Sequence, residues 1–373
     1  MKTFVISLMC VLFISLQVDA KKHTLYVGTY TKGMANGIFV FSFNDQTGRL
    51  IDLKRPAIIN NPTSLTISPS KKYLYAVSEL DSLSADKSGG ISSFRIESDS
   101  KLTLINYVLT HGENPCYVSL SPDGKKLVTT NYRSGSLSFF KILPDGSLSE
   151  MVQRIQHEGS GPFPGRQTQS HPNSARFDTT GKLLFASDLG TDELKIYDIT
   201  TGESMIQPHE QPFVKLAPGS GPRHFDFSAD GRYIYVVNEL SSTIVVLMKY
   251  GGEWKSVQTI KTLPKDFKEE NWGADIHLST DGRFVYVSNL GHNSIAAFKR
   301  DPINGKLELI ESVSVEGNWP QNFTIDPSGR FLVVANQKSN DIVVFKIDQP
   351  SGKLIFTGFK VPTESPVCLQ FLK

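Results

Sequence analysis

One short phrase recurs six times along the 373-residue chain. It reads approximately Ser-Pro-Asp-Gly-Lys/Arg-x-Leu-Tyr-Val-x-Asn, as in residues 119–132 and 226–239. The steps between successive turn positions are 53, 57, 50, 51 and 47 residues, measured at Lys71, Gly124, Gly181, Gly231, Gly282 and Gly329. A period of this length is typical of β-propeller blades and similar repeat arrays.

Each copy of the phrase predicts a β-hairpin. A tight turn, usually Asp-Gly or Ser-Gly, lies between two runs of alternating apolar and polar residues. Further strand-like runs follow, such as 242–250 and 294–300, and a Gly-Lys-Leu or Gly-Ser-Leu phrase then leads into an outer strand. Each repeat therefore contains about four strands, which is the usual content of one blade.

The two ends of the chain supply the halves of a seventh blade. Residues 25–30 match the second strand of a repeat but lack the strand before it, whereas residues 365–371 match a first strand with nothing after it. Pairing the two halves closes the ring and removes its exposed sheet edges. We therefore predict an all-β fold, a seven-bladed β-propeller of four-stranded antiparallel blades, forming one domain over residues 21–373.

Residues 1–20 have the pattern of a signal peptide. Lys2 precedes the apolar run 4–16, and Val18-Asp19-Ala20 offers small residues where a signal peptidase cleaves. The run is too short to span a membrane comfortably. We expect cleavage after Ala20 and an exported, periplasmic or secreted protein without stable membrane association. A closed ring needs no partner for its edges, so we expect a monomer.

Composition excludes several classes of partner and chemistry. Lys and Arg number 39 against 37 Asp and Glu, so the excess basic charge of a nucleic-acid-binding protein is absent. There is no zinc, P-loop or Gly-x-Ser-x-Gly motif, and we expect neither metal nor cofactor. The loop acids Asp188 and Asp192 leave a calcium site open as an alternative. Cys116 and Cys368 lie near inner strands of blades separated by one complete blade, too far apart for a disulfide, so two free thiols are predicted.

Antiparallel pairing brings the start of the first strand and the end of the second to the same mouth of the ring. The residues eight before the turn are Thr63, Cys116, Asn173, Arg223, Ala274, Gln321 and, by alignment, Val367. Those eight after it are Glu79, Tyr132, Leu189, Glu239, Leu290, Gln337 and, by alignment, Tyr30. One repeat stands out, because Arg223, Glu239 and the adjacent His224 combine a cation, an acid and an imidazole. This combination suits acid–base chemistry with oxyanion stabilisation, although an ion pair that stabilises the blade is the alternative.

The position seven after the turn carries only short polar residues, for which we expect a structural role in capping the following turn. These residues are Thr29, Ser78, Asn131, Asp188, Asn238, Asn289 and Asn336.

The phrases HPNSARFD, DLGTDELKIYD, GPRHFDFSADGRYIYVVNEL and NWGADIHLSTDGRFVYVSN, together with the repeat, resemble those of the seven-bladed propeller lactonases. That family includes the cycloisomerase-type 6-phosphogluconolactonase of bacteria and the fungal carboxymuconate cyclase. The resemblance covers essentially everything after the predicted signal peptide. It implies hydrolysis of an intramolecular ester, or the reverse ring closure, without a metal.

By this resemblance Arg223, His224 and Glu239 match the catalytic positions of the family. Glu239 or His224 would take a proton from water, and Arg223 would stabilise the oxyanion or hold a carboxylate or phosphate of the substrate. The candidate substrate-binding residues are His171, Asn173, Asp275, His277 and Gln321.

Two positions depart from the family pattern. Asn173 stands where family members usually carry His, although His171 lies two residues earlier, and Leu290 stands where they usually carry Arg. Together with the predicted export, these departures favour an unphosphorylated sugar-derived lactone, or a loss of catalysis. The alternative function is therefore a non-catalytic exported propeller that binds a small molecule or a protein partner at the same mouth.

Overall fold

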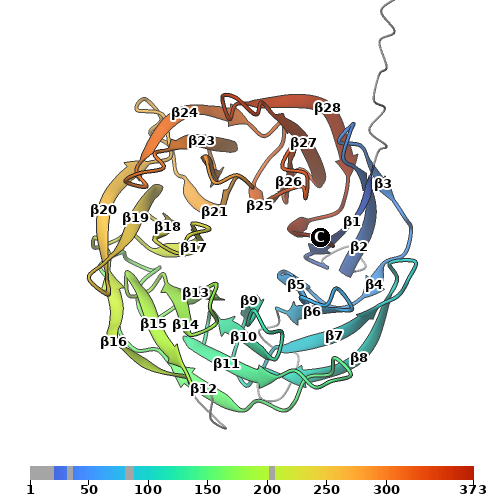
Figure 1. Cartoon of the computed structure of the whole chain (residues 1–373), viewed down its shortest axis with the longest axis horizontal. Helices are drawn as coiled ribbons and strands as arrows, with labels where there is room; N and C mark the ends of the chain where they lie inside the picture. The colour runs from blue at the N-terminus through green and yellow to red at the C-terminus, as the bar shows by residue number, and fades with distance from the viewer. Residues whose placement is uncertain (1–20, 32–36, 80–87, 201–205) are drawn as a thin grey trace, which may run out of the picture.

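The computed structural model describes residues 21–31, 37–79, 88–200 and 206–373, and the predicted signal peptide lies outside these ranges. Within them the regular elements are all β-strands. The strands form six four-stranded antiparallel sheets and one sheet of five strands. The sheets stand around a central axis as the blades of a propeller, which confirms the predicted fold (Figure 1). The described part of the chain has no helix long and apolar enough to cross a membrane.

The strands of each blade are counted outward from the central axis, beginning with the innermost strand (Figure 1). These first strands are β5 (Leu65–Ile67), β9 (Pro115–Leu120), β13 (Pro172–Phe177), β17 (Pro222–Phe227), β21 (Trp272–Leu278), β25 (Pro320–Ile325) and β29 (Pro366–Phe371). The second strands are β6 (Tyr73–Ser78), β10 (Lys126–Asn131), β14 (Leu183–Asp188), β18 (Tyr233–Asn238), β22 (Phe284–Leu290), β26 (Phe331–Asn336) and β1 (Lys22–Thr29).

The third and fourth strands form the outer part of each blade. The third strands are β2 (Gly37–Asn44), β7 (Gly90–Ile96), β11 (Ser136–Lys141), β15 (Glu193–Ile199), β19 (Thr243–Tyr250), β23 (Ser294–Arg300) and β27 (Asp341–Ile347). The fourth strands are β3 (Leu50–Asp52), β8 (Leu102–Leu109), β12 (Gln153–Gln156), β16 (Ile206–Lys215), β20 (Glu253–Lys261), β24 (Leu307–Ser314) and β28 (Leu354–Pro362). The short strand β4 (Ala57–Ile58) also pairs with β2.

The hairpin turns show why the repeated phrase prefers glycine. The turn residue is left-handed in every copy, with φ of 66° at Gly231 and 69° at Gly282, a conformation that glycine adopts at little cost. The first copy has Lys71 at this position with φ of 61°, and its amide still donates to the Ser68 carbonyl at 2.8 Å. The hydrogen-bonded turn is therefore kept even where the glycine is lost.

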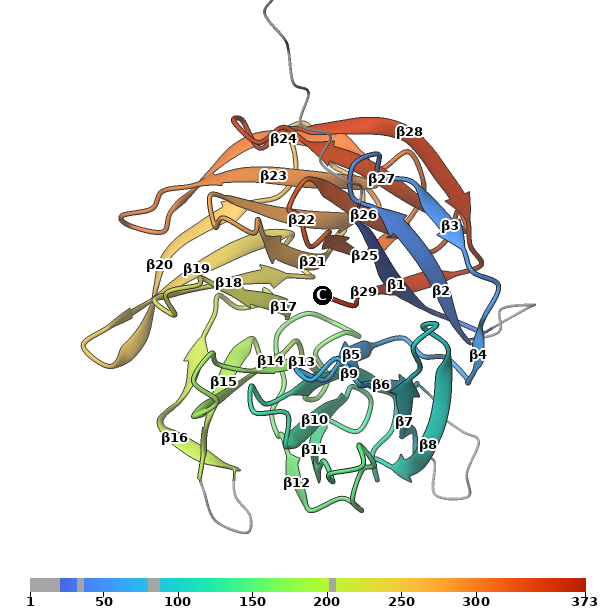
Figure 2. The same cartoon turned by 45° about the vertical axis from the view of Figure 1, so that its right-hand side comes forward.

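The ring closes through the two ends of the described chain. Strand β29 pairs antiparallel with β1, from Leu25 opposite Phe371 to Thr29 opposite Pro366. The closing sheet thus takes its innermost strand from the C-terminal end and its other strands from the N-terminal end (Figure 2). This is the shared blade that the sequence predicts.

The hydrophobic core lies between neighbouring blades. Each of its clusters joins side chains from two adjacent sheets, so the core is a set of blade interfaces around the ring. Phe43 illustrates the arrangement at the closing blade. Its ring meets Phe371 of the same sheet at 5.2 Å and Phe331 of the adjacent sheet at 5.8 Å, both edge-on.

The short polar residues seven after each turn are buried and hold each blade together. Asn131 donates to the side chains of Ser136 and Ser138 on the third strand, and Asn336 donates to Asp341. Their role is structural, as expected. Most of their partners lie on the third strand, because antiparallel pairing places that strand directly beside them. Asp188 is the exception, since it accepts from the Gly190 amide in the following turn and from the connection before β13.

Candidate active site

A β-bulge places two consecutive functional side chains at the channel. The pairing of β17 with β18 shifts between Pro222 and Phe225, so Arg223 and His224 together face one residue, Val237. In a regular strand adjacent side chains point to opposite faces, and a bulge re-aims one of them. As a result both Arg223 and His224 line the pocket at one mouth of the ring.

This mouth pocket has a volume of about 230 Å³. Most of its lining comes from the positions eight before and eight after the hairpin turns, as antiparallel pairing predicts. The lining residues are Tyr30, Thr63, Glu79, Asn114, Cys116, Tyr132, Arg166, Asn173, Arg223, His224, Glu239, Gln321 and Val367.

Glu239 is held by two guanidinium groups. Arg223 Nη1 donates to Oε2 at 2.9 Å, and Arg166 Nη2 donates to Oε1. Glu239 is only 5% exposed, so these charge-assisted bonds form largely out of water. Both oxygens of this carboxylate are occupied by guanidinium donors. Glu239 is therefore better placed to orient the two arginines than to accept a proton.

Arg166 belongs to the long connection between β12 and β13. Its guanidinium lies over the Trp272 ring at 4.9 Å and donates to the Tyr132 hydroxyl at 3.4 Å as well as to Glu239. The connection thus crosses the mouth toward other blades and delivers a second guanidinium beside Arg223.

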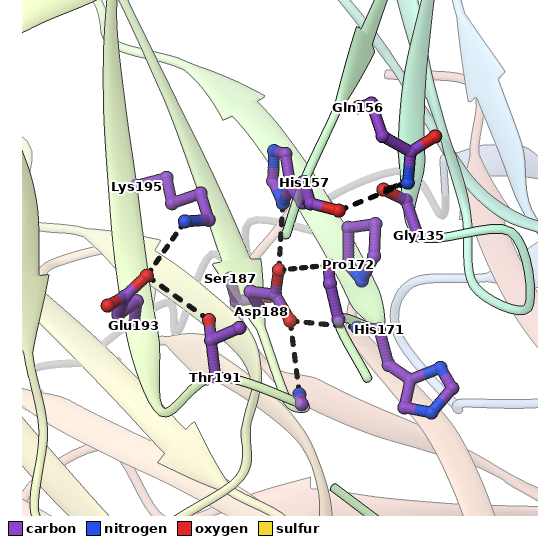
Figure 3. A network of polar contacts seen from close by, with 12 residues as sticks. Gly135, Gln156, His157, His171, Pro172, Ser187, Asp188, Thr191, Glu193 and Lys195 are labelled. Atoms are coloured by element: carbon purple, nitrogen blue, oxygen red, sulfur yellow. Dashed lines mark hydrogen bonds and ion pairs between the residues drawn. The ribbon is translucent and has the colours of Figure 1, made fainter. Parts of the chain in front are cut away.

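The buried carboxylate of Asp188 anchors this connection (Figure 3). Its Oδ2 accepts bonds from Ser170 Oγ at 2.5 Å and from His157 Nδ1 at 2.8 Å, while Oδ1 accepts from the His171 amide at 2.8 Å. Burial opposes the charge of Asp188, but the His157 bond and charge outweigh it and lower the pKa of this carboxyl. Asp188 therefore ties down both ends of the segment that carries Arg166.

His224 is oriented by a second buried carboxylate. Its Nδ1 donates to Asp275 Oδ1 at 2.8 Å, and its ring meets the Tyr117 ring edge-on at 5.3 Å. Burial lowers the pKa of His224, and the bond to Asp275 offsets only part of this effect. His224 is thus neutral near pH 7, with the proton on Nδ1 and a lone pair on Nε2.

Asp275 also contacts groups deeper in the channel. Its Oδ2 accepts from His277 Nε2 at 3.0 Å and from Asn322 Nδ2 at 2.6 Å. Burial works against the charge of both Asp275 and His277, but their mutual attraction lowers the pKa of Asp275 and raises that of His277. The carboxylate therefore remains charged beside His224.

The fold of the chain matches the model of one protein family. A family model described as "Lactonase, 7-bladed beta-propeller" matches residues 24–371. The chain belongs to the seven-bladed propeller lactonase family. Its relatives named 6-phosphogluconolactonase and gluconolactonase are carboxylic ester hydrolases, which is the enzyme class that the sequence predicts.

Individual lactonase relatives cover most of the chain. The 6-phosphogluconolactonase of Bacillus subtilis is 37% identical over 300 residues, which are 79% of this chain and 83% of the relative. A 6-phosphogluconolactonase of Formosa agariphila is 38% identical over 292 residues, 77% of this chain and 81% of that one. The solved structure of a periplasmic gluconolactonase of Pseudomonas aeruginosa has a TM-score of 0.90 at 37% identity and covers 95% of this chain and 99% of its own.

Of the predicted site residues, the catalytic candidates Arg223, His224 and Glu239 all line the mouth pocket. Asn173 and Gln321 also line it. His171 does not line the pocket and instead supports its wall, because its ring stacks on Tyr132 at 4.6 Å and its Nδ1 donates to the Tyr132 carbonyl at 2.9 Å.

The other two predicted substrate-binding residues, Asp275 and His277, do not reach the mouth pocket. They line a larger channel cavity of about 600 Å³ that opens among the Gly-turn residues at the opposite mouth. Positions further along a first strand lie progressively deeper in the channel. His224 lines both spaces, so the link from Asp275 to the mouth runs through it.

Sequence reasoning about the lactonase site missed Arg166 and passed over Glu79. Arg166 lies in an insertion outside the repeated phrase, and the only signal is the step of 57 residues, the longest in the chain. Leu290, which replaces a usual family Arg, is buried, and Arg166 supplies the second guanidinium at this mouth from another direction.

The calcium alternative is not supported by the described residues. Beside Asp188, Asp192 accepts bonds from the Gln167 side chain and from the amides of Gly219 and Gly221. Carboxylates occupied in this way stabilise loops. No group of three or more His, Cys, Asp or Glu residues in the described ranges could hold a metal ion.

The two cysteines of the described chain are free, as predicted. Cys116 lines the mouth pocket, but burial raises the pKa of its thiol to about 12. A thiol that stays protonated is a poor nucleophile, so Cys116 is a packing residue here.

Proposed function

We propose that this protein hydrolyses a sugar-derived lactone in the mouth pocket, opening the ring ester to a hydroxy acid in carbohydrate metabolism. The observation that carries the proposal is the arrangement of Arg223 and Arg166 on Glu239, with the Asp275-oriented imidazole of His224 in the same pocket. The enzyme class of the family agrees with it.

In the proposed mechanism His224 is the general base. Its Nε2 accepts a proton from a water molecule while Asp275 holds the Nδ1–H and stabilises the imidazolium that forms. The water oxygen attacks the lactone carbonyl, and the Arg223 guanidinium stabilises the negative charge that develops on the carbonyl oxygen. Glu239 keeps Arg223 in place. No step in this scheme requires a metal.

We further propose that the preferred substrate is an unphosphorylated sugar lactone. Among the described lining residues, the charges of Arg166 and Arg223 are shared with Glu239, which leaves little positive charge for a phosphate dianion. The similarity to a protein named as a periplasmic gluconolactonase and the predicted signal peptide support this choice and an exported location.

The non-catalytic alternative is less well supported. A platform that only binds a partner has no need for a buried imidazole–carboxylate pair next to an arginine. Such a pair costs desolvation energy that a binding surface would not require.

A pH-stat assay tests the proposal. The protein comprising residues 21–373 is given gluconolactone, galactonolactone and 6-phosphogluconolactone, beside Glu239→Gln. We expect acid release above the buffer rate, fastest with an unphosphorylated lactone, and a lower kcat in Glu239→Gln because Arg223, which stabilises the oxyanion, loses its anchor. Rates equal to the buffer blank with all three lactones would contradict the proposal.

A further inference from the structure

We propose that Glu79 is the general acid that protonates the leaving ring oxygen during lactone hydrolysis. This inference rests on the proposed lactonase function, and it assigns the second half of the reaction to a residue outside the Arg223–His224–Glu239 group.

The first support is position. Glu79 directly follows β6, whereas Arg223 and His224 lie on β17, across the central axis (Figure 1). All three side chains nevertheless line the same pocket of about 230 Å³. A lactone whose carbonyl faces Arg223 and whose attacking water faces His224 would thus have a carboxyl group on its far side.

The second support is the set of contacts that hold the carboxyl. The Tyr30 hydroxyl donates to Glu79 Oε1 at 3.1 Å, and Asn114 Nδ2 donates to the same oxygen at 3.1 Å. Among the described residues no Lys, Arg or His forms an ion pair with Glu79. The carboxyl is therefore fixed in orientation by neutral donors and is free to carry a proton.

The surroundings of the Glu79 carboxyl also favour its protonated form. Burial raises the pKa of Glu79, and the bonds from Tyr30 and Asn114, the nearby Thr63 hydroxyl and the more distant charge of Arg223 offset this only in part. The titratable groups that face it are Tyr30 and Cys116, whose own pKa values are raised mainly by burial, so both stay neutral near pH 7. Glu239 in the same pocket is paired with two cations. Two carboxyl groups in contrasting environments commonly take different roles in catalysis.

The proton balance of the reaction gives such a group a defined role, because the ring oxygen must take up a proton as it leaves. Water gives one proton to His224 Nε2 as its oxygen bonds to the carbonyl carbon. The tetrahedral intermediate then collapses, the bond between the carbonyl carbon and the ring oxygen breaks, and the ring oxygen takes the proton of Glu79. The product is the open hydroxy acid. His224 loses its proton to solvent and Glu79 regains one, so no oxidant or further reactant is consumed.

The pH dependence of the rate follows from the pKa shifts of His224 and Glu79. Catalysis needs neutral His224, whose pKa is lowered by burial, and protonated Glu79, whose pKa is raised by burial. The rate should therefore fall at acid pH as His224 becomes charged and fall at alkaline pH as Glu79 loses its proton, giving a bell-shaped profile.

The test compares Glu79→Gln with wild type on two substrates. We expect kcat for gluconolactone to fall about 10²- to 10⁴-fold, the usual contribution of general acid–base catalysis, and the Glu79-dependent alkaline limb to disappear. For the matching thiolactone the loss should be much smaller, because a thiolate leaves without a proton. Glu113→Gln, on the same mouth but outside the pocket lining, is the matched control and should behave as wild type.

A second variant guards against misfolding. Tyr30→Phe removes a donor to the charged carboxylate, so the alkaline limb should move to higher pH. Equal losses on lactone and thiolactone, or an unmoved limb in Tyr30→Phe, would overturn the role of Glu79 while leaving lactonase activity established. Wild-type protein inactive on every lactone would overturn the proposed function itself.

Discussion

Replacing Arg223 with alanine should lower kcat for lactone hydrolysis by about 10²- to 10³-fold, the effect of removing one oxyanion donor. The guanidinium is pre-positioned by its 2.9 Å bond to Glu239, so it needs no reorganisation when charge develops on the carbonyl oxygen. Arg223→Lys should recover only part of the rate, because a single ammonium cannot both bond Glu239 and reach the oxyanion in the same planar geometry. Steady-state kinetics on the folded variants measures both effects.

The control for this experiment is Arg154→Ala. Arg154 is an exposed arginine on β12 that bonds Gln156 and does not line the mouth pocket. Its loss changes the net charge equally, and kcat should stay at the wild-type value. Wild-type kcat in Arg223→Ala would show that the oxyanion is stabilised elsewhere.

Replacing Phe43 with alanine should lower the free energy of unfolding by about 3–5 kcal/mol, the usual cost of removing a buried aromatic side chain. Phe43 is fully buried and meets both Phe371 of the closing strand and Phe331 of the adjacent blade. The cavity would lie where the ring closes, so the two ends of the chain should separate first. Urea unfolding followed by circular dichroism and by tryptophan fluorescence measures the loss.

Ile303→Ala is the matched control for stability. Ile303 is 81% exposed, and a surface truncation of this kind usually changes stability by less than about 0.5 kcal/mol. If Phe43→Ala unfolded at the same urea concentration as Ile303→Ala, closure of the ring by this interface would be disproved.

The fold could be predicted because the same hairpin pattern recurs along the chain. The glycine turns set the hairpins, and the unmatched strands at the ends identify the shared blade before any contact is known. The same pattern predicted the ring of residues at the mouth, including Arg223 and Glu239, because antiparallel pairing fixes which ends of two strands meet.

The parts of the site that could not be predicted depend on contacts outside the repeat. Arg166 reaches Glu239 from a connection whose path is set by the buried Asp188 network, and no sequence period describes it. The depth of Asp275 in the channel, and its bond to His224, depend on where the β-bulges fall. Glu79 was visible in the repeat, but its contrast with Glu239 arises from neighbours on other strands.

The most direct test of the central claim is a crystal structure of the protein with gluconolactam, which replaces the ring ester by an amide that resists hydrolysis. The lactam is soaked at a concentration shown to inhibit lactone hydrolysis. We predict that it occupies the mouth pocket, with its carbonyl oxygen bonded to Arg223 and the ring between His224 and Glu79. An inhibitory lactam bound only in the channel cavity at the opposite mouth, with the mouth pocket unchanged, would contradict this assignment of the active site.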